Sequence, residues 1–182
     1  MSKDILNSNF FELFELPVSY EVDFNQVQQY YMALQKQVHP DKFANSSDQE
    51  KRLSMQQTSW INEAQSTLKD PVLRAIYLLK LKGTDINLEN ETTMDAAFLM
   101  QQLETRERLE NVKKEDDPLA ALDDMTKELK ASTSSMMKGF AQSYEAGQID
   151  DAREWIRKLQ FMQKAKKEIN SLTADIEDEL MS

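Results

Sequence analysis

Apolar residues recur at spacings of three and four along most of the chain, a pattern that predicts amphipathic helices. The first clear stripe covers residues 24–38, and Asp23 is a suitable N-cap just before it. The members of this stripe are Phe24, Val27, Tyr31, Leu34 and Val38. Earlier in the chain, a dense apolar cluster over residues 10–16 stops at Pro17 and predicts a short buried helix.

A second long helix is predicted over residues 47–69. Ser47 and Glu50 have the spacing of a capping box at its start. The side of this helix that we expect to face the first one is formed by Leu53, Gln56, Trp60, Ala64 and Leu68. The two helices therefore have complementary stripes.

Five residues separate these helices, His39-Pro40-Asp41-Lys42-Phe43. Pro40 disfavours helical geometry at His39 and cannot continue the helix itself. The two helices must then fold back on each other as a hairpin. We expect His39 and Asp41 to lie exposed at its turn.

The remaining pattern predicts four more helices. Asp70-Pro71 starts a helix over residues 71–81 that is apolar on most sides, so we expect it to be buried. Residues 84–91 are polar and predict a linker. Helical stripes follow over residues 94–114, from Pro118 to a stop at Gly147, and from a cap at Asp150 or Asp151 onwards. We expect an all-α protein with a first domain over residues 1–83, a linker over 84–91 and a three-helix antiparallel bundle over 92–182.

Composition agrees with this fold class and narrows the function. The 182 residues include only three Gly and four Pro, and helix formers are abundant. The formal net charge of −10 argues against non-specific binding to nucleic acid or to an anionic membrane. No cysteine, signal-peptide pattern or membrane-length apolar run is present, so we expect a soluble cytoplasmic protein.

The helix predicted over residues 94–112 has two apolar faces, although a three-helix bundle needs only one. At about 100° per residue, one face contains Met94, Phe98, Thr105, Leu109 and Val112. The other contains Ala96, Leu99, Met100 and Leu103, flanked by Glu104, Arg106 and Glu107. An exposed apolar patch with an acidic rim is typical of a protein-binding site. The alternative is that this second face packs on the first domain.

Phe161 is a further candidate for this apolar surface. It lies about a third of a turn away from the stripe formed by Trp155, Leu159, Met162 and Ile169. It is therefore either part of the same binding surface or a partly covered surface aromatic residue.

His39 is the only histidine, and Asp41 lies two residues after it. An exposed carboxylate on a rigid turn can accept a bidentate hydrogen bond from an arginine of a partner. A catalytic pair would require the two side chains to face each other, which is rare for neighbours at a turn, and no Ser or Cys nucleophile has a recognisable motif. We expect no catalysis, no metal site and no cofactor.

The first domain resembles a J-domain, in which a helical hairpin carries His-Pro-Asp at its turn. The wider pattern resembles the J-type co-chaperones of iron–sulfur cluster assembly, the HscB family. The stretches that carry this resemblance are residues 10–17 (FFELFELP), 39–43 (HPDKF), 61–64 (INEA), 74–79 (RAIYLL) and 97–100 (AFLM).

This resemblance implies a co-chaperone that binds the iron–sulfur scaffold protein (IscU-type) and delivers it to a DnaK-class (HscA-type) ATPase chaperone. It implies that the J-domain stimulates ATP hydrolysis by the chaperone through His39, Pro40, Asp41, Lys42 and Lys36. It also implies that the scaffold is bound through Leu99, Met100, Leu103, Glu104, Glu107 and Phe161. We expect a monomer that performs no bond-breaking of its own.

Two features depart from what J-domains usually contain. The helix before the turn offers only Lys36 as a basic residue, and no cysteine is available for the N-terminal metal module that some relatives carry. A general J-protein for misfolded clients would contain a Gly/Phe-rich or cysteine-rich client region, which this sequence lacks. A small all-α hydrolase is the third alternative and would require a concave site lined by convergent polar groups.

Overall fold

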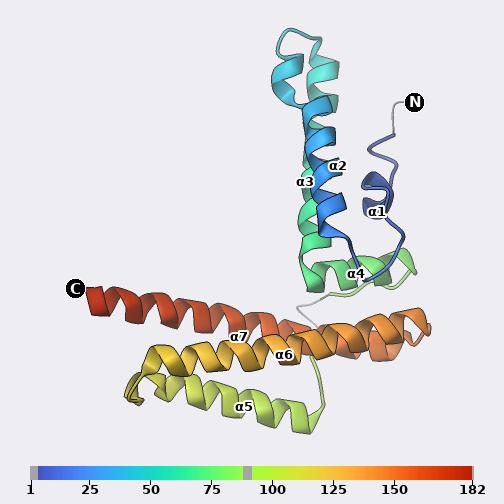
Figure 1. Ribbon diagram of the computed structural model, residues 1–182. Coiled ribbons are helices and arrows are strands. Elements are labelled where there is room, and N and C mark those ends of the chain that lie inside the picture. The colour runs from blue at the N-terminus through green and yellow to red at the C-terminus, as the bar shows by residue number, and fades with distance from the viewer. Residues whose placement is uncertain (1–3, 88–91, 182) are drawn as a thin grey trace. The chain divides into compact units, whose positions relative to one another are not determined.

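The computed structural model describes residues 4–87 and 92–181, and it contains helices and no strand in those ranges (Figure 1). The all-α prediction is confirmed. The chain divides into two compact units, Met1–Gly83 and Thr84–Ser182. Within the predicted linker, residues 84–87 have no regular structure, and residues 88–91 lie outside the described part.

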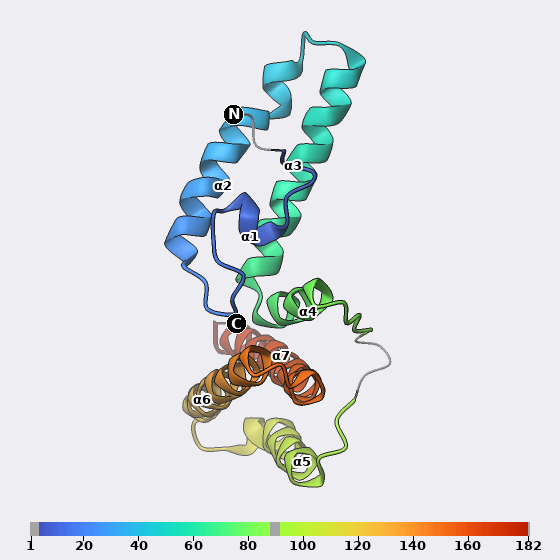
Figure 2. The ribbon, with the colours of Figure 1, turned by 90° about the vertical axis from the view of Figure 1, so that its right-hand side faces the viewer.

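The first unit is built on a hairpin of α2 (Phe24–Val38) and α3 (Asp48–Lys69), which lie side by side and antiparallel (Figures 1 and 2). A short 3-10 helix, η1 (Pro40–Phe43), forms the turn between them. Both predicted caps are present, since Asp23 accepts from two amides of α2 and Ser47 forms a capping box with Glu50. α4 (Pro71–Leu81) crosses the far end of the hairpin.

The short helix α1 (Phe10–Leu13) packs against α3 and supplies the core of the first unit. Phe11, Leu13 and Phe14 are completely buried there. The Phe10 ring stacks on Tyr77 of α4 at 4.2 Å and meets the edge of Trp60 of α3 at 4.9 Å between centroids. These aromatic contacts join α1, α3 and α4 into one core.

The predicted inward stripes of the hairpin need correction at Phe24, Leu53 and Gln56, and Gln56 is exposed. Leu53 is 44% exposed, whereas its neighbour Ser54 is buried, so the inward face of α3 begins one residue later than predicted. The reason is a hydrogen bond, because the hydroxyl of Ser54 donates to the carbonyl of Val38 at the end of α2. Phe24 is 46% exposed and does not belong to the core of the hairpin.

The helix α4 buries one face instead of all its sides. Val72, Ala75, Leu78 and Leu79 are buried, but Leu73 and Leu81 are exposed, so the prediction that a helix apolar on most sides would be buried is wrong for these two residues. The buried face includes Arg74, whose guanidinium donates to the carbonyl of Leu68 at 2.6 Å and lies 4.5 Å from the ring of Tyr20. Burial raises the pKa of Tyr20 above its usual value.

The second unit is a bundle of α5 (Ala96–Asn111), α6 (Pro118–Glu145) and α7 (Ile149–Met181), with η2 (Val112–Lys114) between α5 and α6. Consecutive helices run antiparallel, so α5 and α7 point the same way (Figure 1). Gly147 adopts a φ of 72° and ends α6 as predicted. The core at the end near η2 is formed by Leu109, Val112, Leu122, Met125, Ile169 and Ile176.

Two predictions about helix starts in the bundle are wrong. Met94 is 85% exposed instead of facing the bundle, because α5 begins at Ala96 and Met94 precedes its cap, Asp95. α7 begins at Ile149, so Asp150 and Asp151 occupy its first turn instead of capping it. Carboxylates in the first turn still interact favourably with the helix dipole.

α6 and α7 approach each other closely at Gly139. A Cβ atom at this position would lie 2.5 Å from Cε2 of Trp155 on α7. The indole Nε1 of Trp155 donates to the hydroxyl of Ser143, one turn further along α6, at 3.3 Å. The absence of a side chain at residue 139 therefore makes room for the indole.

Candidate functional site

The end of α2 is held by two hydroxyl groups of α3. The carbonyl of Val38 accepts hydrogen bonds from Ser54 Oγ at 2.6 Å and from Thr58 Oγ1 at 3.5 Å. No later amide in α2 can satisfy this carbonyl, because Pro40 ends the helical pattern. These bonds fix the point from which the turn leaves the hairpin.

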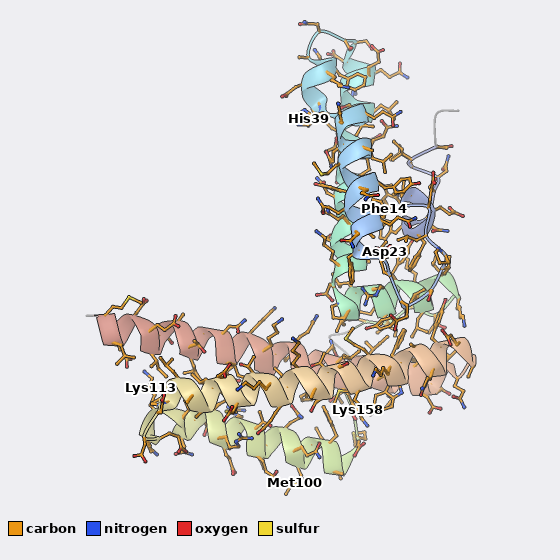
Figure 3. The ribbon with its side chains drawn as sticks, viewed as in Figure 1. Phe14, Asp23, His39, Met100, Lys113 and Lys158 are labelled. Atoms are coloured by element: carbon orange, nitrogen blue, oxygen red, sulfur yellow. The ribbon has the colours of Figure 1, made fainter. Side chains whose placement is uncertain are left out.

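The turn itself is organised by His39 (Figure 3). The backbone amide of Asp41 donates to Nδ1 of His39 at 3.3 Å, so the imidazole caps the 3-10 helix η1. The amide of Lys42 donates to the His39 carbonyl at 3.0 Å. With Nδ1 accepting, a neutral His39 carries its proton on Nε2, away from the amide of Asp41.

The turn presents its charged groups to solvent. The side chain of Asp41 is 91% exposed and that of His39 is 53% exposed, with Nδ1 and Oδ2 3.5 Å apart. The two side chains do face each other, so the expectation that they would not is wrong. Lys36 and Lys42 are also exposed, and Pro40 is half-buried. The turn is therefore a preorganised surface feature carrying both signs of charge.

The start of α5 in the bundle is tied to α7 by a separate network. Asp95 caps α5 by accepting from the amide of Phe98 at 3.1 Å, and its other oxygen accepts from Lys158 Nζ at 2.6 Å. The hydrogen bond from Lys158 holds the pKa of Asp95 below its usual value. The buried hydroxyl of Thr93 accepts from the amide of Asp95 and donates to Glu154. Sequence reasoning missed this network, because only the cap has a local signal.

The second face of α5 is exposed. Relative exposures are 37% for Leu99, 58% for Met100 and 50% for Leu103. The opposite side buries Phe98 and Leu109 of α5 and Val112 of η2. Figure 3 shows Met100 on the side of α5 away from α6 and α7. Leu99 and Leu103 also line a groove of about 350 Å³ between α5 and α7. We call this exposed face and its groove the α5 face.

Phe161 of α7 forms the opposite wall of the groove. Its ring is half-buried and meets Phe98 edge-to-face, with the centroids 5.6 Å apart. Phe161 is therefore both supported from beneath by the bundle core and open to the groove. The structure thus brings Phe161 together with Leu99 and Leu103.

Charged groups border the α5 face. Glu104 and Glu107 are exposed on the side of α5 that carries Met100. Arg106 lines the groove, and its Nε is 3.2 Å from Oε1 of Glu110. Lys164 lines it from α7, and its Nζ lies 5.8 Å from the Phe161 ring. The sequence reasoning did not single out Lys164.

The described residues contain neither a candidate metal site nor a candidate membrane span. No group of three or more His, Asp or Glu side chains is placed to hold a metal ion there. Among the same residues, no helix is both long and apolar enough to cross a membrane.

An antiparallel helix pair joined by His-Pro-Asp, with α1 packed against it and α4 across its far end, defines the chain as a J-domain protein with a C-terminal helical bundle. Residues 94–170 match the family model described as the HSCB C-terminal oligomerisation domain. The co-chaperone protein HscB homolog of Shewanella halifaxensis is 46% identical over 164 residues, which is 88% of this chain and 94% of that protein. The chain belongs to the HscB family of co-chaperones.

Solved structures of the family agree with this assignment. The chaperone HscB from Vibrio cholerae has a TM-score of 0.83 at 38% identity and covers 95% of this chain and 99% of that one. Human co-chaperone protein HscB has a TM-score of 0.81 at 29% identity, covering 90% of this chain and 81% of that one. Both units of the chain therefore have counterparts in solved relatives.

Proposed function

We propose that this protein binds an iron–sulfur cluster scaffold protein (IscU-type), delivers it to a DnaK-class (HscA-type) chaperone and stimulates ATP hydrolysis by that chaperone. The observation that carries the proposal is the exposed α5 face, where Leu99, Met100 and Leu103 are 37%, 58% and 50% exposed and do not belong to the buried core of the bundle. Membership of the HscB family supports the link to iron–sulfur cluster assembly, through the resemblance described above.

The chaperone is bound at the turn of the J-domain. His39, Pro40 and Asp41 form the centre of this contact, and Lys36 and Lys42 supply its positive charge. An exposed carboxylate such as Asp41 can accept a bidentate hydrogen bond from an arginine of the chaperone. The hydroxyls that anchor Val38 reduce the entropy lost when the chaperone binds, because the turn is already ordered.

The scaffold is bound at the α5 face. Leu99, Met100, Leu103 and Phe161 provide its apolar centre, where most binding energy is concentrated in protein interfaces. Glu104 and Glu107 lie at the rim, where charges act mainly on the association rate and on salt sensitivity. The two partners therefore use different units of the chain.

Single-turnover ATP hydrolysis by the matched DnaK-class chaperone tests the proposal. We expect the wild-type protein to accelerate hydrolysis and His39→Gln and Asp41→Asn to lose that acceleration, with unchanged circular dichroism because the turn is exposed. Calorimetric titration with the scaffold provides the second arm, and both variants should bind the scaffold like wild type. Full acceleration by both variants, or an absence of scaffold binding by the wild type, would overturn the proposal.

A further inference from the structure

The groove of the α5 face is apolar at its centre and charged at one end. Leu99 and Leu103 form the α5 wall, Phe161 and Ala165 form the α7 wall, and the charged lining residues are Arg106, Lys164 and Glu168. A volume of about 350 Å³ is at the lower end of the range for pockets that take a ligand. This space suits one or two side chains from a partner protein.

The two cations that line the groove differ in their pairing. Arg106 already has a carboxylate partner, since its Nε is 3.2 Å from Glu110. Lys164 has no carboxylate partner among the residues that the structure describes, and its Nζ lies 5.8 Å from the centre of the Phe161 ring. Glu168 lies one helical turn further along α7, but no ion pair joins it to Lys164. The groove therefore has an ammonium group available beside its apolar centre.

We propose that Lys164 binds a carboxylate of the scaffold, so that the segment in the groove presents an apolar side chain with an acidic residue beside it. This inference rests on the proposed function of the α5 face and adds the chemistry of the segment that it recognises. Lys164 is a specificity-determining residue on α7, whereas the other proposed contacts, apart from Phe161, are on α5.

The charge distribution over the α5 face favours this occupant. Lys164 lies on the α7 side of the apolar centre, and Glu104 and Glu107 lie on its outer α5 side. A scaffold segment with the opposite arrangement of charges pairs with both sides of the face. Its acidic residue lies beside Lys164 on α7, and its basic residue lies beside Glu104 and Glu107 on the outer side of α5. The reversed orientation would place like charges opposite each other, which selects one docking direction.

Charge variants of α7 test the role of Lys164 by calorimetric titration with the scaffold. For Lys164→Ala we expect affinity to fall about two- to fivefold at low ionic strength, the effect of one exposed ion pair. For Lys164→Glu, which adds repulsion, we expect a loss of more than about tenfold. Both losses should shrink at high ionic strength, because salt screens exposed charges. Glu168→Gln should strengthen binding slightly, since it removes a negative charge near the incoming carboxylate.

Lys166→Glu is the matched control. It makes the same change in net charge on the same helix, but Lys166 lies about 200° further round α7 than Lys164 and does not line the groove. We expect it to bind the scaffold within about twofold of wild type, because a distant exposed charge is largely screened. Equal losses for Lys164→Glu and Lys166→Glu would overturn the inference by showing a general charge effect.

A double-mutant cycle identifies the carboxylate. Exposed Asp and Glu residues of the scaffold are neutralised one at a time and titrated with wild type and with Lys164→Ala. One of them should weaken binding to wild type and leave binding to Lys164→Ala unchanged. If none does so while Leu103→Ala still weakens binding, the proposed function stands and this inference fails. If Leu103→Ala has no effect either, the α5 face is not the scaffold site and the proposed function fails.

Discussion

Truncation of Leu103 tests the α5 face, because half of this side chain is exposed and half is packed. Leu103→Ala removes three carbon atoms, and each buried methylene contributes about 0.8 kcal/mol. Complete burial of the removed atoms would therefore contribute about 2.4 kcal/mol, of which the exposed half leaves about 1.2 kcal/mol for a partner to supply. We expect scaffold affinity to fall about sevenfold, and the free energy of unfolding to fall by about 1 kcal/mol.

Leu53→Ala on α3 is the control, because Leu53 is 44% exposed and carries the same side chain outside the α5 face. It should lower stability to a similar extent and leave scaffold affinity unchanged. Calorimetric titration measures affinity at a temperature at which both variants are folded, and urea denaturation measures the free energy of unfolding. The comparison separates a lost contact with the scaffold from a general loss of stability.

The combined replacement of Leu99, Met100 and Leu103 by Ala enlarges the effect. Each exposed portion contributes about 1 kcal/mol, so affinity should fall by about a hundredfold or more, although adjacent side chains do not add strictly. Scaffold binding by the triple variant within about twofold of wild type, together with a steep fall in its melting temperature, would contradict a binding role for these side chains. That outcome would make the α5 face part of the fold, as in the alternative in which it packs on the first domain.

Three further results are expected. His39→Gln should leave scaffold affinity within about twofold of wild type even though ATPase stimulation is lost, because His39 lies in the first unit and the α5 face lies in the second, and substitutions at independent sites act separately. A larger loss of affinity would contradict separate sites. Gly139→Ala should lower the free energy of unfolding in urea by about 1–3 kcal/mol, because the new Cβ displaces the Trp155 indole and outweighs the gain in helix propensity; a more stable variant would contradict this. The hydrogen bond from Lys158 lowers the pKa of Asp95, so the ion pair stabilises the fold above the usual aspartate pKa of about 4, and this stabilisation is lost as the pH falls below that value towards the lowered pKa of the folded state. The difference in melting temperature between wild type and Asp95→Asn should therefore shrink as the pH falls below about 4. A difference that stays constant with pH would contradict this role of the ion pair.

Local signals in the sequence predicted the helices of the hairpin well. Pro40 excludes a continuous helix whatever surrounds it, and Asp23, Ser47 and Asp70 cap helices through bonds to amides two or three residues away. Such effects depend on the neighbouring residues alone, so the sequence contains them in full. The helix boundaries of the hairpin therefore follow from short-range chemistry, whereas the hydrogen bonds that anchor Val38 to α3 do not.

The errors in the first unit arose where a distant group changes the preference of a residue. Ser54 replaces Leu53 on the inward face of α3 because the Val38 carbonyl, 16 residues earlier, accepts its hydroxyl. Arg74 is buried in α4 because its guanidinium donates a hydrogen bond to the Leu68 carbonyl and lies over the ring of Tyr20. A helical wheel assigns residues to faces by their polarity alone, so it does not include the distant groups that pair with Ser54 and Arg74.

The candidate scaffold site also has one part that local sequence predicts and one part that depends on distant residues. The two-faced pattern of α5 is visible in the sequence, since it depends only on helical spacing. The groove is not, because it also needs Phe161 and Lys164, which reach it from a helix more than fifty residues further along the chain. Lys164 has no sequence signal that separates it from Lys166 and Lys167. Only the packing of α5 beside α7 selects it.

The tie between Asp95 and α7 affects how the bundle opens. Helix ends normally fray, so the amides of a first turn exchange with solvent long before the core unfolds. Here the cap of α5 is bonded to Lys158, and Thr93 is bonded to Glu154 one turn away on α7. The first turn of α5 can therefore open only when these links to α7 break. Its amides should therefore exchange with solvent together with those of α7, as one cooperative unit. Leu99 and Met100 thus lie near a helix start that frays no more than the middle of a helix.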